Sequence, residues 1–189
     1  MKENKYDDNI FFQKYSQMSR SQQGLAGAGE WETLRKLLPD FKDKRVLDLG
    51  CGYGWHCIYA MEHGASSVVG VDISHKMLEV AKEKTHFPQV EYKCCAIEDV
   101  EFPEESFDVI LSSLAFHYVA DYEILVKKIY RILKSGGKLV FTVEHPVFTA
   151  YGTQDWHYNE KGEILHFPVD NYYYEGKRTA VFLGEKVTK

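Results

Sequence analysis

The chain has 189 residues, of which 44% are hydrophobic and 27% charged, so its size and composition are those of one globular domain and not of a disordered or fibrous protein. Its formal net charge of -5 argues against a nucleic-acid partner, because that partner needs basic clusters that displace counterions. No apolar run reaches the ~20 residues that span a bilayer, and no apolar signal core follows the first residues, so we expect a cytoplasmic protein without a membrane partner.

Residues 1–44 form a polar lead-in with two runs of apolar side chains at helical spacing. The runs are Phe11, Phe12, Tyr15 and Met18, followed by Trp31, Leu34 and Leu38. Between them the glycine-rich run 24–29 suggests a hinge, and Pro39 closes the second run. The first apolar face either packs on the core or acts as a lid over a cofactor, in which case Tyr15 lies on the substrate side.

Residues 45–144 alternate strand-like and helix-like patterns. Apolar, β-branched runs predict strands at 45–49, 67–72, 90–95, 107–113 and 138–143. Ser74 is a predicted helix N-cap, and Gly136-Gly137 is expected to end the last helix. Five runs joined by helices predict a parallel sheet with helices on both faces. Right-handed crossovers make this a doubly wound, Rossmann-like α/β fold.

Residues 145–189 are rich in aromatic side chains and predict one or two β-hairpins. The aromatic residues are Phe148, Tyr151, Trp156, Tyr158, Phe167, Tyr172, Tyr173, Tyr174 and Phe182. Turns are predicted at 159–162 and 175–177. Such an insertion has three alternative roles: it walls an acceptor pocket on the substrate side, it packs onto the domain, or it forms a subunit contact. The third role would imply a homodimer. We expect the three regions to form a single domain.

The cysteines favour reduced thiols over a metal site or a disulfide framework. They are Cys51, Cys57, Cys94 and Cys95. Their spacing is not the Cys-x-x-Cys pattern of zinc and redox sites, and adjacent cysteines rarely pair with each other. We therefore expect no metal and mostly buried thiols.

A glycine-rich turn follows the first predicted strand. It consists of Asp48-Leu49-Gly50-Cys51-Gly52-Tyr53-Gly54. Glycine lets the backbone turn tightly there and approach a ligand, at the edge of the sheet where doubly wound folds bind ligands. Asp72 ends the second strand about 20 residues later, the distance at which a carboxylate accepts hydrogen bonds from both ribose hydroxyls.

The glycine spacing favours a ligand without a phosphate. In the dinucleotide pattern Gly-x-Gly-x-x-Gly, a pyrophosphate meets the N-terminus of a helix. Here the third glycine, Gly54, comes one residue early, and the bulky indole of Trp55 takes its place. Asp48 adds negative charge near the turn, which favours a cationic ligand. A cation with a ribose and no phosphate points to S-adenosylmethionine; an NAD-dependent oxidoreductase is the alternative for this turn.

Residues 46–54 resemble the first signature of the class I S-adenosylmethionine-dependent methyltransferases. Further segments resemble later signatures of that family, in the same order: 69–74, 95–99, 107–119 and 133–139. The similarity is strongest to the bacterial small-molecule branch often called methyltransferase type 11. It implies that the chain binds S-adenosylmethionine, methylates a small molecule, and releases S-adenosylhomocysteine.

The resemblance also implies which residues contact the cofactor. They are Asp48, Gly50, Cys51, Gly52, Asp72, Ile73, Met77, Ile97, Glu98 and Ser112. Gly50 and Gly52 would lie against the methionine and ribose portions, and Ser112 near the methionine moiety. Asp72 would bind the ribose hydroxyls; a solvated strand end is its alternative.

The adenine would lie between two pairs of residues. By the same resemblance, Ile73 and Met77 would pack on one side of the ring, and Ile97 and Glu98 would border the other. Each has an ordinary structural alternative: Met77 as a core residue, for example, and Glu98 as a surface charge in an acidic loop.

His117 is the candidate base for an acceptor that loses a proton. It follows the carboxyl end of the fourth strand, where the methyl group is expected, and an imidazole has an ordinary pKa of ~6.5. The alternative is packing against Tyr118. Glu144 and His145 end the fifth strand on the substrate side, where they bind the acceptor or brace the turn at Pro146.

Two further features bear on activity. Enzymes that methylate base amino groups of nucleic acid usually carry an Asn/Asp/Ser-Pro-Pro-aromatic run where this chain has 112–117, without proline. The family's sheet normally has seven strands, whereas five are predicted here. Either the hairpins replace the last strands, or the sequence is a shortened form. The alternative function is therefore a catalytically weak or inactive cofactor-binding domain.

Overall fold

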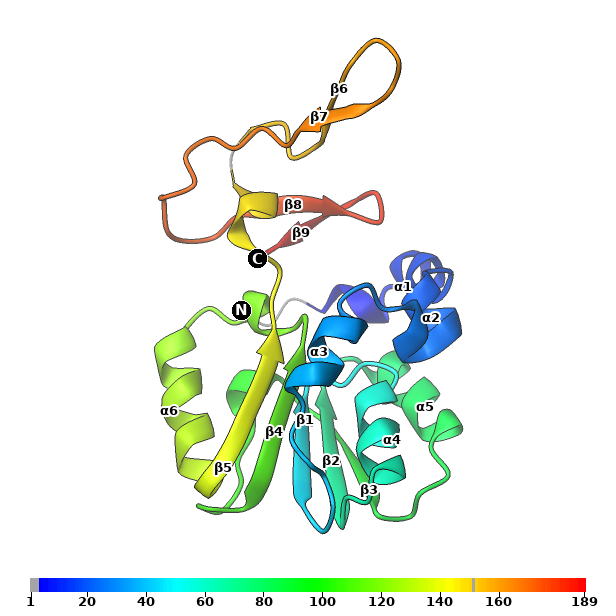
Figure 1. Cartoon of the computed structure of the whole chain (residues 1–189), viewed down its shortest axis with the longest axis vertical. Coiled ribbons are helices and arrows are strands. Elements are labelled where there is room, and N and C mark those ends of the chain that lie inside the picture. Colours follow the sequence, from blue (N-terminus) through cyan, green and yellow to red (C-terminus); the bar gives the residue numbers. More distant parts are fainter. Residues whose placement is uncertain (1–3, 151) are drawn as a thin grey trace. The chain divides into compact units, whose positions relative to one another are not determined.

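The computed structural model describes residues 4–150 and 152–189, so Tyr151 and the first three residues lie outside the described residues. The chain divides into two compact units, one ending at Val143 and the other comprising Glu144–Lys189 (Figure 1). None of the helices among the described residues combines the length and apolarity needed to cross a bilayer.

The first unit is built on a five-stranded parallel sheet. Its strands are β1 (Arg45–Leu49), β2 (Ser67–Asp72), β3 (Val90–Cys94), β4 (Phe107–Ser113) and β5 (Leu133–Thr142). Their order is β3-β2-β1-β4-β5, as Figure 1 shows. The strand order reverses between β1 and β4, which confirms the predicted doubly wound fold and places its switch point at their carboxyl ends.

The start of β5 differs from the prediction. Helix α6 (Tyr122–Ile132) ends directly before it, and β5 begins at Leu133, five residues earlier than predicted. Phe107 of β4 pairs with Leu133 while Val109 pairs with Lys138, so the register shifts between them. The prediction that Gly136-Gly137 ends the helix was therefore wrong, because the two glycines lie in a strand irregularity, where Gly136 has a φ of 76°.

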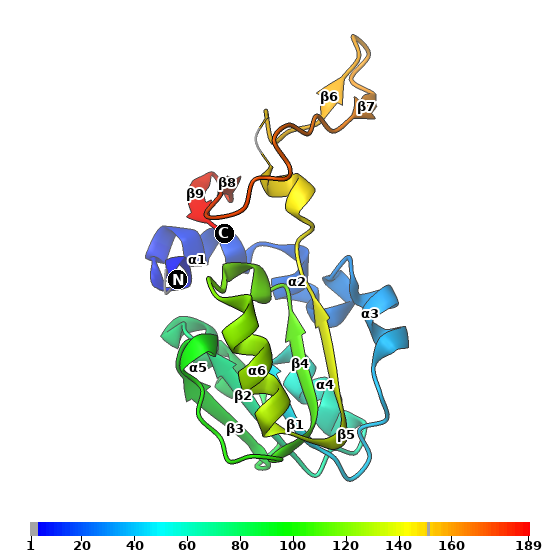
Figure 2. The same cartoon turned by 90° about the vertical axis from the view of Figure 1, so that its left-hand side faces the viewer.

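Helices cover both faces of the sheet. Helices α4 (Trp55–Glu62) and α5 (His75–Lys84) bury side chains in the core of one face, and α6 covers the other, as Figure 2 shows. Ser74 caps α5 as predicted, because its Oγ accepts a hydrogen bond from the N–H of Met77 at 3.2 Å. The predicted arrangement of layers is confirmed.

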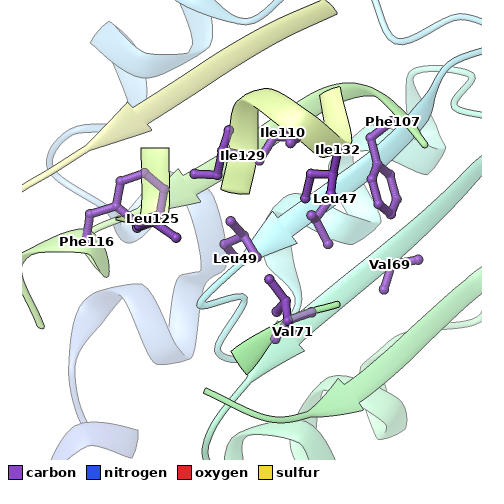
Figure 3. Close-up of a cluster of buried hydrophobic side chains, with 11 residues drawn as sticks. Leu47, Leu49, Val69, Val71, Phe107, Ile110, Phe116, Leu125, Ile129 and Ile132 are labelled. Atoms are coloured by element: carbon purple, nitrogen blue, oxygen red, sulfur yellow. The ribbon is translucent and has the colours of Figure 1, made fainter. Parts of the chain in front are cut away.

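The core beneath α6 follows from the spacing of its apolar residues. Leu125, Ile129 and Ile132 recur every three or four positions and are at most 2% exposed. They pack on Leu47 and Leu49 of β1, among the other side chains drawn in Figure 3. Because full burial of each such side chain contributes about 1.5–3 kcal/mol, this face fixes α6 on the sheet.

The lead-in consists of short helices that fold against the first unit's core. They are η1 (Lys5–Asp7), α1 (Asn9–Ser16), α2 (Ser19–Gln23), η2 (Gly24–Gly27) and α3 (Trp31–Leu37). Helices of this length are marginal alone in water, so tertiary contacts must hold them. Figures 1 and 2 both show α1 and α2 beside the carboxyl-terminal end of the sheet. The glycine-rich run expected to be a hinge is the compact turn η2, where Ser19 Oγ donates to the carbonyl of Gly27 at 2.8 Å.

The second unit contains two antiparallel hairpins and one short helix. Its elements are η5 (Pro146–Thr149), β6 (His157–Tyr158), β7 (Ile164–His166), β8 (Thr179–Phe182) and β9 (Glu185–Thr188). The first hairpin turns at 159–162 as predicted. The second turns at Leu183–Gly184, where both residues have positive φ, so the turn predicted at 175–177 does not join strands.

Candidate functional site

The carboxyl ends of β1, β2 and β4 bring together most of the predicted cofactor residues. Asp48 belongs to β1, and the glycine turn follows that strand directly. Asp72 is the last residue of β2, and Ser112 lies next to the last residue of β4. Because β1 is hydrogen-bonded to both β2 and β4, residues far apart in the sequence meet at one edge of the sheet.

The glycine turn is fastened to β2 by its backbone. The N–H groups of Gly50 and Cys51 both donate to the carbonyl of Val71, at 2.8 and 2.9 Å. A Cβ placed on Gly50, whose φ is 79°, would overlap the Cβ of Ala115. Cys51 is 6% exposed and lies in the core beneath the turn with Cys57. Gly50 and Cys51 thus shape the turn.

Gly52 presents open backbone on the same turn. Its φ is 52°, and no atom of the described residues lies within 4 Å of the position that a Cβ would take. Its N–H donates to Oδ2 of Asp72 at 2.8 Å, while Oδ1 of Asp72 accepts from the N–H of Ser74 at 2.9 Å. Each carboxylate oxygen has a second lone pair, so the side chain can still accept two hydroxyl hydrogens. The geometry fits a ribose beside Gly52.

One buried and one half-buried carboxyl group lie beside this turn, those of Asp48 and Asp72. Asp48 is 1% exposed; Cys57 Sγ donates to its Oδ2 at 3.4 Å, and its Oδ1 has no hydrogen-bond partner among the described residues. Burial, together with the nearby charge of Asp72, raises the pKa of Asp48 to about 7. Burial also raises the pKa of Asp72. An unsatisfied buried oxygen and two carboxyls suit a positively charged ligand.

The predicted adenine residues occupy two elements. Ile73 is half-buried and its carbonyl accepts from Asn4 Nδ2 at 3.3 Å. Met77 is 2% exposed on α5, as expected of a core residue. Ile97 and Glu98 begin the short helix η3 (Ile97–Asp99), and Ile97 packs against the core beneath α6. Contact of these four residues with an adenine stays a prediction.

The two serines at the end of β4 have different partners. Ser112 is 2% exposed and its Oγ donates to the carbonyl of Leu49 at 2.8 Å, so its hydroxyl joins β4 to β1. Ser113, which the sequence did not single out, donates to Oε1 of Glu30 at 3.2 Å. The hydroxyl of Ser113, next to the switch point, therefore connects β4 to the lead-in.

The lead-in supplies an ion pair that the sequence did not predict. Arg20 Nη2 lies 2.5 and 2.6 Å from the two carboxylate oxygens of Glu30, and both side chains are less than a quarter exposed. Burial opposes the ionisation of Glu30, but its own backbone N–H and Arg20 together lower its pKa. The only sequence signal was the occurrence of a charge on each side of the glycine-rich run.

Asp7 fastens the lead-in to the turn after β2. It accepts hydrogen bonds from Ser74 Oγ at 2.6 Å, from Lys76 N at 3.1 Å and from His75 N at 3.4 Å. These groups form the first turn of α5, two residues after Asp72. The first residues of the described chain thus lie next to the candidate ribose ligand.

Tyrosines join the lead-in to the loop after β4. Tyr6 Oη lies 3.3 Å from Tyr118 Oη, which belongs to the short helix η4 (Phe116–Tyr118). Tyr15, predicted on the substrate side, packs edge-to-face on Tyr6 and on Tyr53 of the glycine turn, with centroid distances of 5.3 and 5.8 Å. Burial raises the pKa of Tyr15.

The predicted acceptor residues divide between the two units. His117 lies in η4, with its ring centroid 4.3 Å from that of Tyr118. Glu144 and His145 belong to the second unit. There His145 Nδ1 accepts from the N–H of Val147 at 3.3 Å, and Glu144 forms an ion pair with Lys189.

Known structures of similar sequence share this fold. The chain is similar to an assigned S-adenosylmethionine-dependent methyltransferase from Listeria monocytogenes, with 56% identity, a TM-score of 0.79, and coverage of 85% of this chain and 76% of that one. An S-adenosylmethionine-dependent methyltransferase from Mesorhizobium loti is 41% identical with a TM-score of 0.75, over 82% of this chain and 70% of that one.

Sequence relatives and a family profile agree with the structural similarity. A ubiquinone biosynthesis O-methyltransferase from Coxiella burnetii is 36% identical over 112 residues, which are 58% of this chain and 47% of that protein. The chain thus spans about half the length of that enzyme. The profile described as a methyltransferase domain matches residues 47–141, from the middle of β1 to the end of β5. The chain therefore belongs to the methyltransferase domain family.

Proposed function

We propose that this protein binds S-adenosylmethionine at the carboxyl ends of β1 and β2 and transfers its methyl group to a small molecule. One observation carries most of the proposal: Gly52 exposes open backbone beside Asp72, while Asp48 is buried with an unsatisfied oxygen. A phosphate-free, positively charged nucleoside matches both features, whereas a pyrophosphate would approach one buried and one half-buried carboxyl. The bound cofactor supplies a methyl group already activated by the neighbouring sulfonium.

Each cofactor portion has candidate partners in the chain. Asp72 binds the ribose hydroxyls, and Gly50 and Gly52 let the backbone approach the sugar and the methionine chain. Ile73 and Ile97 lie on the two elements that flank the adenine position. Asp48 is almost fully buried and its pKa is raised to about 7, so a bound cation would favour its ionised form.

The ion pair of Arg20 and Glu30 suits the zwitterionic end of the methionine portion. A guanidinium recognises a carboxylate and a carboxylate recognises an ammonium, so the pair offers a partner to each. Glu30 is bonded to Ser113, at the end of β4, where the methionine portion is expected. This makes the lead-in part of the cofactor site as well as its lid.

The acceptor is a small molecule, and in the first unit the loop after β4 carries its candidate contact. His117 is the candidate to take a proton that the acceptor loses. Such a proton must leave as the methyl carbon exchanges its bond to sulfur for a bond to the acceptor atom. The similarity to the O-methyltransferase from Coxiella burnetii favours an oxygen acceptor. Contact of Glu144 and His145 with the acceptor stays a prediction.

Calorimetry with Asp72→Asn tests the cofactor assignment. The unmodified chain should bind S-adenosylmethionine and not NAD, and Asp72→Asn should weaken binding at least about tenfold because an amide accepts fewer hydrogens. Asp40→Asn is the matched control, because Asp40 lies in the exposed loop before β1. Preferential binding of NAD, or equal affinity of Asp72→Asn and the parent, would refute the assignment.

Product analysis separates an enzyme from a binding domain. With pooled metabolites and S-adenosylmethionine, an active protein forms S-adenosylhomocysteine above the rate without protein. Cofactor binding without that product would favour the alternative of a catalytically weak or inactive domain.

A further inference from the structure

The second unit has a surface cavity of its own that is open to solvent. Its volume is about 300 Å³, at the lower end of the range found for small-molecule sites. Residues from η5, β8 and the segments around the first hairpin line it. The space is therefore large enough for one ring with small substituents and belongs to residues 144–189 alone.

Three aromatic rings form one wall of this cavity. Phe167 lies in the middle, with its ring centroid 5.2 Å from that of Phe148 and 5.3 Å from that of Trp156. Both pairs are edge-to-face, with interplanar angles of 69° and 77°. Phe148 and Trp156 are each 42% exposed. Partly exposed aromatic side chains around a cavity favour a flat, apolar ligand body that stacks on them.

The cavity is held open by polar bonds behind its surface. The side-chain amide of Gln154 donates to the carbonyl of Thr179 at 3.0 Å and to those of Ala150 and Thr149 at 3.3 and 3.4 Å. These bonds connect β8 with the end of η5. Because Gln154 and the three carbonyl groups all belong to this unit, these bonds fix the walls of the cavity before a ligand binds.

An ion pair on the cavity wall determines which charge a ligand can carry. Glu144 pairs with Lys189, whose side chain is 7% exposed and whose Nζ lies 5.8 Å from the ring centroid of Phe182. Asp155 adds a second carboxylate to the lining. An anionic ligand is repelled by two carboxylates, and a cationic ligand, which the carboxylates attract, is repelled by the buried ammonium. Separating a largely desolvated pair is costly, so a charged competitor is disfavoured.

A hydroxyl group satisfies this wall without breaking the ion pair. It donates to a carboxylate oxygen of Glu144 and accepts from the ammonium of Lys189, since each ion has further hydrogen-bonding capacity. We propose that the cavity binds a neutral hydroxyaromatic ring. That this ring belongs to the methyl acceptor rests on the proposed function; the binding itself does not.

Four probes of similar size test the proposal by calorimetry on the whole chain. They are catechol, benzoate, benzylammonium and cyclohexanol, which differ in charge and in the presence of an aromatic ring. Catechol should bind at least about tenfold tighter than each of the other three. Equal or tighter binding of benzoate, benzylammonium or cyclohexanol would overturn the proposal, and so would the absence of catechol binding.

Substitutions locate the binding in this cavity. Phe167→Leu keeps an apolar side chain but removes the central ring, and should weaken catechol binding about tenfold. Trp156→Leu gives a second reading at a more exposed wall position. Tyr173→Leu is the matched control, because Tyr173 is 74% exposed in the same unit and does not line the cavity. The proposal fails if the control weakens binding as much as the two wall variants.

Removing the ammonium should change the preferred charge. In Lys189→Met, Glu144 keeps its carboxylate without a cation, so benzylammonium should bind better and catechol worse. Unchanged preferences would contradict the role of the ion pair. Titration with S-adenosylmethionine is run on the same variants: normal cofactor binding without catechol binding overturns this inference alone, whereas loss of cofactor binding by the unmodified chain refutes the proposed function.

Discussion

Gly52 donates its backbone N–H to Oδ2 of Asp72 at 2.8 Å, across 20 positions of the sequence. The bond fastens the glycine turn to the strand that carries the candidate ribose ligand. Asp72 therefore has two roles in the proposed site, because the carboxylate that fastens the turn is also the candidate ligand of the ribose. A substitution at Asp72 changes both, so the role of the turn is better tested at Gly52.

We expect Gly52→Ala to fold and to lose cofactor affinity. The new methyl group meets no atom within 4 Å in the described part of the chain, but it fills the side on which the ligand approaches, at a φ of 52°. The left-handed conformation costs roughly 1–2 kcal/mol of stability, and the filled space should weaken S-adenosylmethionine binding at least about tenfold.

Gly136→Ala provides the control for backbone strain in Gly52→Ala. Gly136 has a φ of 76° and open space around its Cβ position, and it lies in β5 of the same unit. The unfolding midpoint of Gly136→Ala should fall about as much as that of Gly52→Ala, whereas its affinity for S-adenosylmethionine should stay unchanged. Equal losses of affinity in both variants would mean that strain, and not the blocked approach, explains the result.

Arg20→Lys should weaken cofactor binding and change little else. A lysine keeps the charge but lacks the planar fork that can bond Glu30 and a second carboxylate together, so we expect about a tenfold increase in the Kd for S-adenosylmethionine. Arg35→Lys serves as the comparison, since Arg35 pairs with Glu32 at 2.9 Å in the same lead-in, with exposures of 49% and 72%. Calorimetry that finds the two variants alike would remove Arg20 from the proposed site.

Asp48 should make the unliganded protein less stable as the pH rises. Its folded pKa of about 7 lies above the ordinary value of 3.8, so the folded state holds a proton that the unfolded state has lost. Stability from this group is full below the unfolded pKa and falls as the pH rises to about 7. Between the unfolded and the folded pKa of Asp48, the free energy of unfolding falls by roughly 4 kcal/mol at most.

Asp48→Asn isolates this effect, because the amide has nearly the same shape and does not titrate. Urea unfolding of parent and variant at about pH 5 and about pH 8 gives four free energies of unfolding. The parent should lose more stability between the two pH values than Asp48→Asn does. If the two proteins lose the same amount, the carboxyl of Asp48 is ionised throughout, contrary to its burial.

The core beneath α6 gives a direct test of the fold. Ile129 is 2% exposed, so Ile129→Ala should lower the free energy of unfolding by about 2–5 kcal/mol through lost burial and the cavity left behind. Ile124 is 61% exposed on the same helix, so Ile124→Ala should lower the free energy of unfolding by less than about 0.5 kcal/mol. Similar losses at both positions would show that α6 packs with a different face.

The sequence alone determined the sheet and the position of its glycine turn. Strands β1, β2 and β4 have the predicted bounds, because each is a short apolar run between clear breaks, and buried parallel strands need such runs. The sequence indicated Asp48, Gly52 and Asp72 because each lies near the end of a predicted strand, where a doubly wound fold binds its ligand. The methyltransferase family could be recognised for the same reason.

Only the tertiary structure decided which distant residues join that turn. Asp7 and Arg20 lie in short helices of the lead-in, and Glu30 lies in the turn before α3. Asp7 contacts Ser74 and Glu30 contacts Ser113, in each case across more than 60 positions of the sequence. The start of β5 and the turn of the last hairpin were likewise set by pairing with other strands. Local residue preferences record what a segment can form, whereas hydrogen bonds between segments depend on where the whole chain places them.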